Sequence, residues 1–405
     1  MAGDYAGKGH GKPRLIALYF ILYASMFLFG LIESIKGVSL PLVKSEFGVS
    51  YDSQGGLVSL SSFGYVAFCL VASLFLQRFG LKKSMLVGYF LVCAGAAVAT
   101  VVPSFWMASL TFIMINAGFG FLEVATNALG TVAFTSKAAL LMGLLHFFYG
   151  FGSIVGPKAA GLLTSSLSFS WRQVYITTIV PVAALALFAL STRFDRPRSH
   201  PNGNSRSQVS FLSALRNPVV WLFSLTLGFM EVVEFGAVNW GALYLQDVYQ
   251  LDPRTVGASF VSAFYVMFTL SRLLSGLAIE KAGYVRSLYI SAVCTIVAYL
   301  IGFALGRNGI WVLPFTGLFI AIMWPTMMAV AMKAFGPDAP VVTSAIITIS
   351  GAINAVVQLI IGFTGEILGE AWGYRGCLLY AVVVLLSLRQ LDRASSRRSN
   401  ACTTW

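Results

Sequence analysis

Apolar residues run through this chain in long blocks that short polar segments separate. A helix rises 1.5 Å per residue, so about 20 apolar residues cross a hydrocarbon core of about 30 Å. Blocks of that kind predict twelve membrane-spanning helices, numbered here as spans 1 to 12: 15–40, 56–76, 84–103, 105–134, 138–164, 172–192, 218–245, 256–279, 287–306, 310–332, 341–365 and 372–388. The twelfth is the weakest, because its uncharged part, from Gly376 to Leu388, is shorter than a full crossing. Either the segment from Trp372 to Arg375 enters the membrane or this terminus is atypical.

Composition supports the same class of protein. Hydrophobic residues make up 58% of the chain and charged residues 10%, whereas soluble domains carry about 25% charged residues. The first apolar stretch is too long for the hydrophobic region of a signal peptide and lacks a small-residue cleavage pattern, so we expect no cleaved leader. We therefore predict a multi-pass integral membrane protein of a plasma or inner membrane.

The net charge of +12 bears on topology rather than on nucleic acid. Basic residues concentrate in the N-terminal tail, in the turn after span 2, in the segment 193–216 and in the C-terminal tail. These segments share one side of the membrane if the N-terminus is cytoplasmic, and the positive-inside rule then predicts that both termini are cytoplasmic. The five cysteines show neither metal nor disulfide spacing, so no metal and no cofactor are predicted.

A repeat divides the chain into two halves. The long polar segment 195–217 predicts a cytoplasmic linker between an N-terminal six-helix half, 1–194, and a C-terminal six-helix half, 218–405. The turn after span 2 carries Gln77-Arg78-x-Gly80, and the turn after span 8 carries Glu280-Lys281-x-Gly283. Both copies lie at one offset, since 280 − 77 = 203 and 283 − 80 = 203. Such a repeat indicates two copies of one structural unit.

These turns resemble the G-x-L-a-D-r-x-G-r-k signature of the major facilitator superfamily. The second copy fits well, whereas in the first copy Gln77 replaces the acid and Ser73 the leading glycine. In span 5, GFGSIVGPKAAG (150–161) is similar to the G-x-x-x-G-P motif of the same superfamily. Gly152 and Gly156 permit a close helix approach, and Pro157 permits a bend.

The resemblance implies an all-α membrane protein of the major facilitator fold, with twelve transmembrane helices in two pseudo-symmetric six-helix halves and both termini inside. It also implies alternating access by rocking of the halves, with spans 1, 4, 7 and 10 lining a central site. The residues expected to take part in gating or conformational change are Gln77, Arg78, Gly80, Arg272, Glu280, Lys281, Gly283, Gly152, Gly156 and Pro157.

Ionisable residues inside the spans are the main functional signal. A charge at the bilayer centre costs about 2.5–3.5 kcal/mol even on insertion scales, so such groups need water, a partner or a substrate. None lies in the interior of spans 3, 6, 9 or 12, the helices that the fold places against lipid. They occur in spans 1, 4, 5, 7 and 8: Glu33, Lys36, Glu123, His146, Lys158, Glu231, Glu234 and Arg272.

Span 4 carries the most specific of these signals. GFGFLEVATN, with Glu123 and Asn127 one helical turn apart, resembles the L-E-x-x-x-N segment of the fucose/galactose/glucose–proton symporters. The resemblance implies that Glu123 carries a proton or accepts a sugar hydroxyl and that Asn127 hydrogen-bonds beside it. The alternative is a structural ion pair of Glu123 with Lys36 or Lys158.

Span 1 departs from that branch. The symporters of that branch carry an aspartate four residues before the proline that ends the span. Counted back from Pro41, that position is Gly37 in this chain. Either Glu33 serves in place of that aspartate, or Lys36 neutralises Glu33 as an i, i+3 pair.

Span 7 adds two acids, Glu231 and Glu234, and two further polar candidates, Asn239 and Trp240. The spacing E-x5-W-x3-Y-L resembles sugar-porter-like members of the superfamily, in which a tryptophan stacks on the sugar. The alternative for Trp240 is a position in the interfacial aromatic belt.

Four further groups keep two interpretations each. Lys158 either contacts a ligand or extends to the membrane surface, and His146 either titrates or packs. Arg272 either pairs with Glu280 as a gate or receives an anionic substrate. Uncharged candidates for the cavity wall, each with a packing alternative, are Trp324, Asn354 and Gln358.

No phosphate-binding G-x-x-x-x-G-K-S/T loop and no nucleophile with a matching base occur, so an enzyme is not predicted. The sequence favours a secondary active transporter of a small polar solute, most simply a sugar, coupled to a proton or cation and acting as a monomer in lipid. The alternatives are an organic-anion or monocarboxylate porter using Arg272, Lys158 and Lys36, a drug exporter, and a non-transporting receptor or scaffold on the same fold.

Overall fold

The computed structural model describes residues 12–134, 138–194 and 210–399, except for the side chains of 12–13, 138–139, 275–278, 280, 340 and 394–399. Within these ranges the chain forms helices joined by short turns, with no β-strand. The α-helices are α1 (Lys12–Ser34), α2 (Lys36–Phe47), α3 (Tyr51–Phe79), α4 (Leu81–Val98), α5 (Phe105–Ala133), α6 (Ala138–Ser166), α7 (Trp171–Ser191), α8 (Phe211–Ala214), α9 (Pro218–Tyr249), α10 (Ala258–Ala282), α11 (Tyr284–Ala304), α12 (Thr316–Ile320), α13 (Met323–Phe335), α14 (Ala339–Leu368) and α15 (Glu370–Ser399). Single turns of 3-10 or π helix lie at Ala99–Val101, Pro253–Gly257, Gly306–Gly309, Leu313–Phe315 and Gly336–Asp338.

Twelve stretches of the described chain are helical, long and apolar enough to cross a membrane. α1 and α2 together make the first, and the helices from 306 to 338 make the tenth. The twelfth, Glu370–Arg393, is 24 residues long. Span 12 is therefore a helix long enough for a full crossing, and it contains both Trp372 and Arg375.

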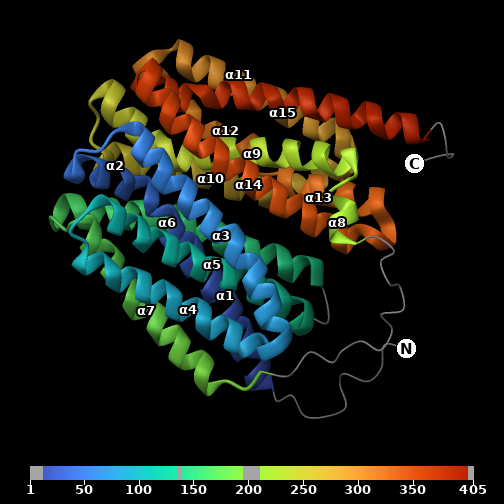
Figure 1. Ribbon diagram of the computed structural model, residues 1–405, viewed down its shortest axis with the longest axis horizontal. Helices are drawn as coiled ribbons and strands as arrows, with labels where there is room; N and C mark the ends of the chain where they lie inside the picture. The colour runs from blue at the N-terminus through green and yellow to red at the C-terminus, as the bar shows by residue number, and fades with distance from the viewer. Residues whose placement is uncertain (1–11, 135–137, 195–209, 400–405) are drawn as a thin grey trace.

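The helices pack lengthwise as two bundles, α1 to α7 and α8 to α15, lying side by side (Figure 1). α1 begins and α15 ends at the same end of the molecule, which we call the terminal end. The opposite end, where α2 leads into α3 and α9 into α10, is called the distal end.

Each bundle has its own apolar core. One core gathers buried side chains from Leu18 to Ala189, and the other gathers side chains from Ala214 to Leu391. Two residues cross between them: Tyr51 of α3 packs in the core of the second bundle, and Ala258 of α10 packs in the core of the first. Both begin their helices at the distal end, so the bundles interlock there.

The repeated turns are built alike. Gly80 ends α3 with φ 86°, and Gly283 ends α10 with φ 84°. The amide of each glycine donates to the carbonyl four residues back, at 2.9 Å in both cases. A positive φ is readily adopted only without a Cβ, which explains why both copies of the repeat carry glycine.

Two spans are interrupted where the sequence predicted continuous helices. α1 stops at Ser34 and α2 starts at Lys36, which places the break of span 1 beside its two charged residues. In span 10, residues 321–322 form a turn between α12 and α13. Pro325 has no amide hydrogen to donate to the carbonyl of Ala321, so a continuous helix would lack one backbone hydrogen bond at that point.

Candidate functional site

The charged residues expected inside the spans occupy α1, α2, α5, α6, α9 and α10. Glu33, Lys36 and Glu234 are buried. Glu123, His146, Glu231 and Arg272 are partly buried, whereas Lys158 is exposed. The residues differ in their partners, and those partners separate structural from candidate functional groups.

Glu33 and Lys36 form an ion pair across the break between α1 and α2. Their side chains are only 8% and 9% exposed. One carboxylate oxygen of Glu33, Oε2, has no hydrogen-bond partner. Of the two interpretations of span 1, the neutralised pair is the one seen in this conformation.

Glu123 is held within its own helix. The amide nitrogen of Asn127 donates to Oε1 of Glu123 at 2.8 Å and to the backbone carbonyl of Glu123 at 2.8 Å. Lys36 is engaged with Glu33, and Lys158 donates to the hydroxyl of Ser259 at 2.6 Å. The structural pairing of Glu123 with either lysine is therefore not formed in this structure.

Arg272 lies at the meeting point of the two bundles. Its guanidinium stacks over the ring of Phe268, with 4.2 Å from Cζ to the ring centroid, and its Nε has no hydrogen-bond partner. It interacts electrostatically with Glu123 and His146 of the first bundle and with Glu234 of the second. Arg272 thus lies within electrostatic reach of acids from both halves.

The acids of α9 have separate surroundings. Glu231 Oε1 accepts a hydrogen bond from the Ser350 hydroxyl at 3.2 Å, and Glu231 also interacts electrostatically with Glu234. Set against Arg272, the acids Glu123, Glu231 and Glu234 leave a net charge of −3 + 1 = −2 in the described central region if all three are ionised. Buried charge of one sign favours the binding of a proton, a cation or a polar ligand.

Three of the uncharged candidates form one hydrogen-bonded chain. The indole nitrogen of Trp240 donates to Gln358 Oε1 at 2.7 Å, and Gln358 Nε2 donates to Asn354 Oδ1 at 3.1 Å. Trp240 is 1% exposed, so the interpretation as an interfacial belt residue is wrong. Asn239 beside it is also buried, and its Oδ1 has no partner. Trp324 packs partly buried against the core of the second bundle.

The residues predicted to act in gating lie in two places. Gly152 and Gly156 of α6 press against α1, where an added Cβ would collide with the carbonyls of Phe27 and Leu31. Pro157 continues α6 without breaking it. At the terminal end the residues of the repeated turns are mostly exposed: Gln77, Arg78, Gly80, Lys281 and Gly283. The side chain of Glu280 lies outside the described residues, as does its predicted pairing with Arg272.

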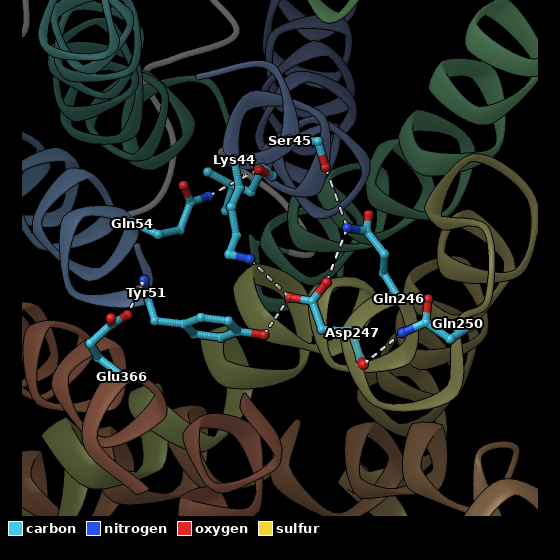
Figure 2. Close-up of polar contacts among 9 residues, drawn as sticks. Lys44, Ser45, Tyr51, Gln54, Gln246, Asp247, Gln250 and Glu366 are labelled. Atoms are coloured by element: carbon cyan, nitrogen blue, oxygen red, sulfur yellow. Dashed lines mark hydrogen bonds and ion pairs between the residues drawn. The ribbon is translucent and has the colours of Figure 1, made fainter. Parts of the chain in front are cut away.

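A group that the sequence analysis missed lies at the distal end (Figure 2). Asp247 of α9 accepts from Lys44 Nζ at 3.2 Å and from the Tyr51 hydroxyl at 2.6 Å, both from the other bundle. Lys44 and Asp247 lie just beyond the apolar parts of spans 1 and 7, so neither was considered as a site residue. No local pattern in the sequence indicates this pair, because its two residues come from different halves.

Comparison with known proteins agrees with this architecture. The model of the Major Facilitator Superfamily matches residues 22–358. The chain belongs to the Major Facilitator Superfamily. The predicted all-α fold with twelve transmembrane helices, the multi-pass membrane location and the transporter family are thereby confirmed, and the proteins of this family are transporters rather than enzymes.

Two curated relatives are sugar transporters. The L-fucose-proton symporter of Escherichia coli (strain K12) is 25% identical over 402 residues, which cover 90% of each chain. The glucose/galactose transporter of Brucella abortus is 24% identical over 368 residues, covering 85% of this chain and 86% of the relative. Among solved structures, the nucleoside transporter NupG superposes with a TM-score of 0.77 at 13% identity over 93% of this chain and 99% of that one. The superposition shows the shared fold.

Proposed function

We propose that this transporter moves a sugar or similarly hydroxylated solute, coupled to a proton or cation, by alternating access between its two halves. The halves are 1–194 and 218–405, joined by the linker 195–217, and the terminal end faces the cytoplasm in accordance with the distribution of basic residues. The observation that carries the proposal is the arrangement around Glu123, taken with the two sugar-transporting relatives.

Glu123 has the surroundings that a proton-linked carboxylate needs. It has no ion-pair partner among the described residues, and the single hydrogen bond to its side chain, from Asn127, leaves Oε2 available. Arg272 is close enough to stabilise the ionised form electrostatically without forming a salt bridge. Protonation of Glu123 would remove a buried charge and lower the cost of enclosing the site, which links proton binding to the conformational change.

Glu234 is the second acid in the proposed coupling. The span-1 aspartate expected from the resemblance is Gly37 here, and the acid available in span 1, Glu33, is already neutralised by Lys36. Glu234 shares Arg272 with Glu123 from the opposite half. In this proposal Arg272 balances two carboxylates, and its position between the halves makes that balance depend on how they are docked.

The solute is recognised by the chain of Trp240, Gln358 and Asn354, with Asn239 beside it. An indole ring offers an apolar face to a pyranose, and amide groups exchange hydrogen bonds with its hydroxyls. The orphan Oδ1 of buried Asn239 is an acceptor for which such a hydroxyl is a partner. Lys36 and Lys158 are each engaged elsewhere, which weighs against the anion porter that would gather them with Arg272.

The test is uptake into proteoliposomes of labelled hexoses and monocarboxylates, with and without an inward proton gradient. We expect hexose accumulation that depends on the gradient. Glu123→Gln should reduce gradient-driven sugar accumulation at least about tenfold. Counterflow exchange of the sugar should stay intact, because the exchange step needs no net proton movement. The matched control is Glu46→Gln, which alters a distal acid that pairs with Arg172.

Sugar accumulation that Glu123→Gln leaves unchanged contradicts the role of Glu123. Transport of carboxylates alone, stopped by Arg272→Ala, contradicts the sugar proposal and supports the anion porter.

A further inference from the structure

The contacts of Asp247 join the two halves at the distal end. Two donors from the first half, Lys44 of α2 and Tyr51 of α3, converge on the same carboxylate oxygen, Oδ2. The other oxygen, Oδ1, accepts from Gln246 at 3.1 Å, and Gln246 in turn donates to Ser45 at 3.4 Å. Figure 2 shows these side chains pointing toward one another from both bundles.

The position of the ion pair is set by the repeat. At this end the halves are offset by 202 residues, because Gly48 and Gln250 both end a helix in the left-handed conformation and Ser50 and Asp252 are the N-caps that follow. The offset becomes 203 only after the π turn Pro253–Gly257, so Lys44 is equivalent to Gln246 and Ser45 to Asp247. The contacts of Lys44 with Asp247 and of Ser45 with Gln246 exchange these equivalents, as contacts across a two-fold axis do. The two contacts therefore lie around the pseudo-two-fold axis at the distal end, where a rocking motion that opens this end separates Lys44 from Asp247.

The pair is shielded enough to matter energetically. The Lys44 and Asp247 side chains are 18% and 10% exposed. The Lys44 ammonium also lies 4.7 Å from the centroid of the Tyr51 ring. Hydrogen bonds to charged groups contribute more than neutral ones, and partial burial reduces their screening by salt.

Tyr51 carries the contact inward to the candidate solute site. Its backbone amide donates to Glu366 Oε2 of α14 at 2.9 Å, which fixes the start of α3 on the second half. Its ring stacks on Trp240, with centroids 6.1 Å apart and planes inclined by 15°. One turn along α3, an added Cβ at Gly55 would lie 2.8 Å from the Cα of Gly362, so the backbones of α3 and α14 are in contact there.

We propose that Asp247, held by Lys44 and Tyr51, is a lock between the halves that keeps the distal end closed, and that its release both opens this end and uncovers Trp240. We call these three residues the distal lock. The lock concerns the conformational cycle and does not depend on which solute is carried or on proton coupling.

The lock is tested by pulsed electron paramagnetic resonance on a cysteine-free background. Spin labels at Ser104 and Arg307, exposed distal positions on the first and second halves, report the opening of this end. Without solute, the parent protein should show a predominant short distance. Asp247→Asn, Tyr51→Phe and Lys44→Met should each raise the ratio of long to short distances, by about tenfold for Asp247→Asn.

Asp252→Asn is the matched control, because Asp252 is a distal acid whose hydrogen bonds stay within its own half. It should leave the distance distribution unchanged. The exchange of charges in Lys44→Asp/Asp247→Lys should return the short distance in part, since it rebuilds the ion pair but removes the acceptor of Tyr51.

The proposal is overturned if Asp247→Asn and Tyr51→Phe give the parent distribution. Should Asp247→Asn fail to yield a monodisperse protein, Tyr51→Phe, which removes a single hydroxyl, decides the question. A failure of sugar uptake with an intact shift in the distances would reject the proposed solute and leave the lock standing.

Discussion

The buried ion pair of Glu33 and Lys36 leads us to predict how much the free energy of unfolding falls when one partner is removed. Both residues are buried, at 6% and 7% exposure, and Glu33 Oε2 already lacks a partner. Lys36→Met keeps an unbranched side chain of similar reach but removes the charge that neutralises Glu33. Removing one partner of a buried ion pair typically costs about 3–5 kcal/mol, because the other charge remains buried and unpaired. We expect a loss in that range in the free energy of unfolding.

The measurement is equilibrium unfolding in mixed micelles titrated with sodium dodecyl sulfate and followed by circular dichroism. Lys158→Met is the matched control: this lysine is exposed and donates only to Ser259, so its loss should cost within about 0.5 kcal/mol. The double variant Glu33→Gln/Lys36→Met should recover most of the stability, because no buried charge is left unpaired.

Two results refute the reasoning. One is a loss for Lys36→Met no larger than that for Lys158→Met. The other is a double variant as unstable as the single one, which would show that Lys36 acts through packing and not through its charge.

Three further predictions concern other contacts. Gln358→Leu leaves the buried Trp240 indole without an acceptor and should lower the free energy of unfolding by about 1–3 kcal/mol in the same titration; no change would contradict the bond. Gly362→Val inserts a side chain against the backbone of Gly55 and should raise the long-distance population between the distal spin labels, whereas an unchanged distribution would show that α3 and α14 tolerate separation. Trp171→Phe removes the 2.7 Å bond from the indole to Glu46 and should cost about 1 kcal/mol, with Trp106→Phe, an exposed tryptophan, as the control that should cost nothing measurable.

Much of the fold was predictable because hydropathy and length alone define membrane spans. The repeated glycines Gly80 and Gly283 also marked the ends of α3 and α10 correctly, since their positive φ is a local requirement. The interruptions of spans 1 and 10 were not predicted. An apolar run carries no information on whether its helix is continuous, and only Pro325 gave a local reason for one of the two breaks.

The candidate site was predictable as a set of residues but not as a set of partners. The burial cost of charge singled out Glu123 and Arg272, yet spacing along the chain did not reveal that they approach each other from different halves. Local spacing did suggest the pair of Glu33 and Lys36, one helical turn apart. Asp247 was not predicted, because a carboxylate at the end of a membrane helix has little desolvation cost and so gives no signal in the sequence. Its contacts form only when α2, α3 and α9 are assembled.

The paired contacts around the pseudo-two-fold axis have a consequence for the history of the chain. In a protein assembled from two identical copies of one half, each contact near the axis would occur twice, once on either side. The ion pair of Lys44 with Asp247 would then be repeated by its equivalent. In this chain the equivalent contact is the hydrogen bond from Gln246 to Ser45, which joins uncharged groups. The two halves have therefore diverged at these positions, and divergence has left the charge in one of the two contacts.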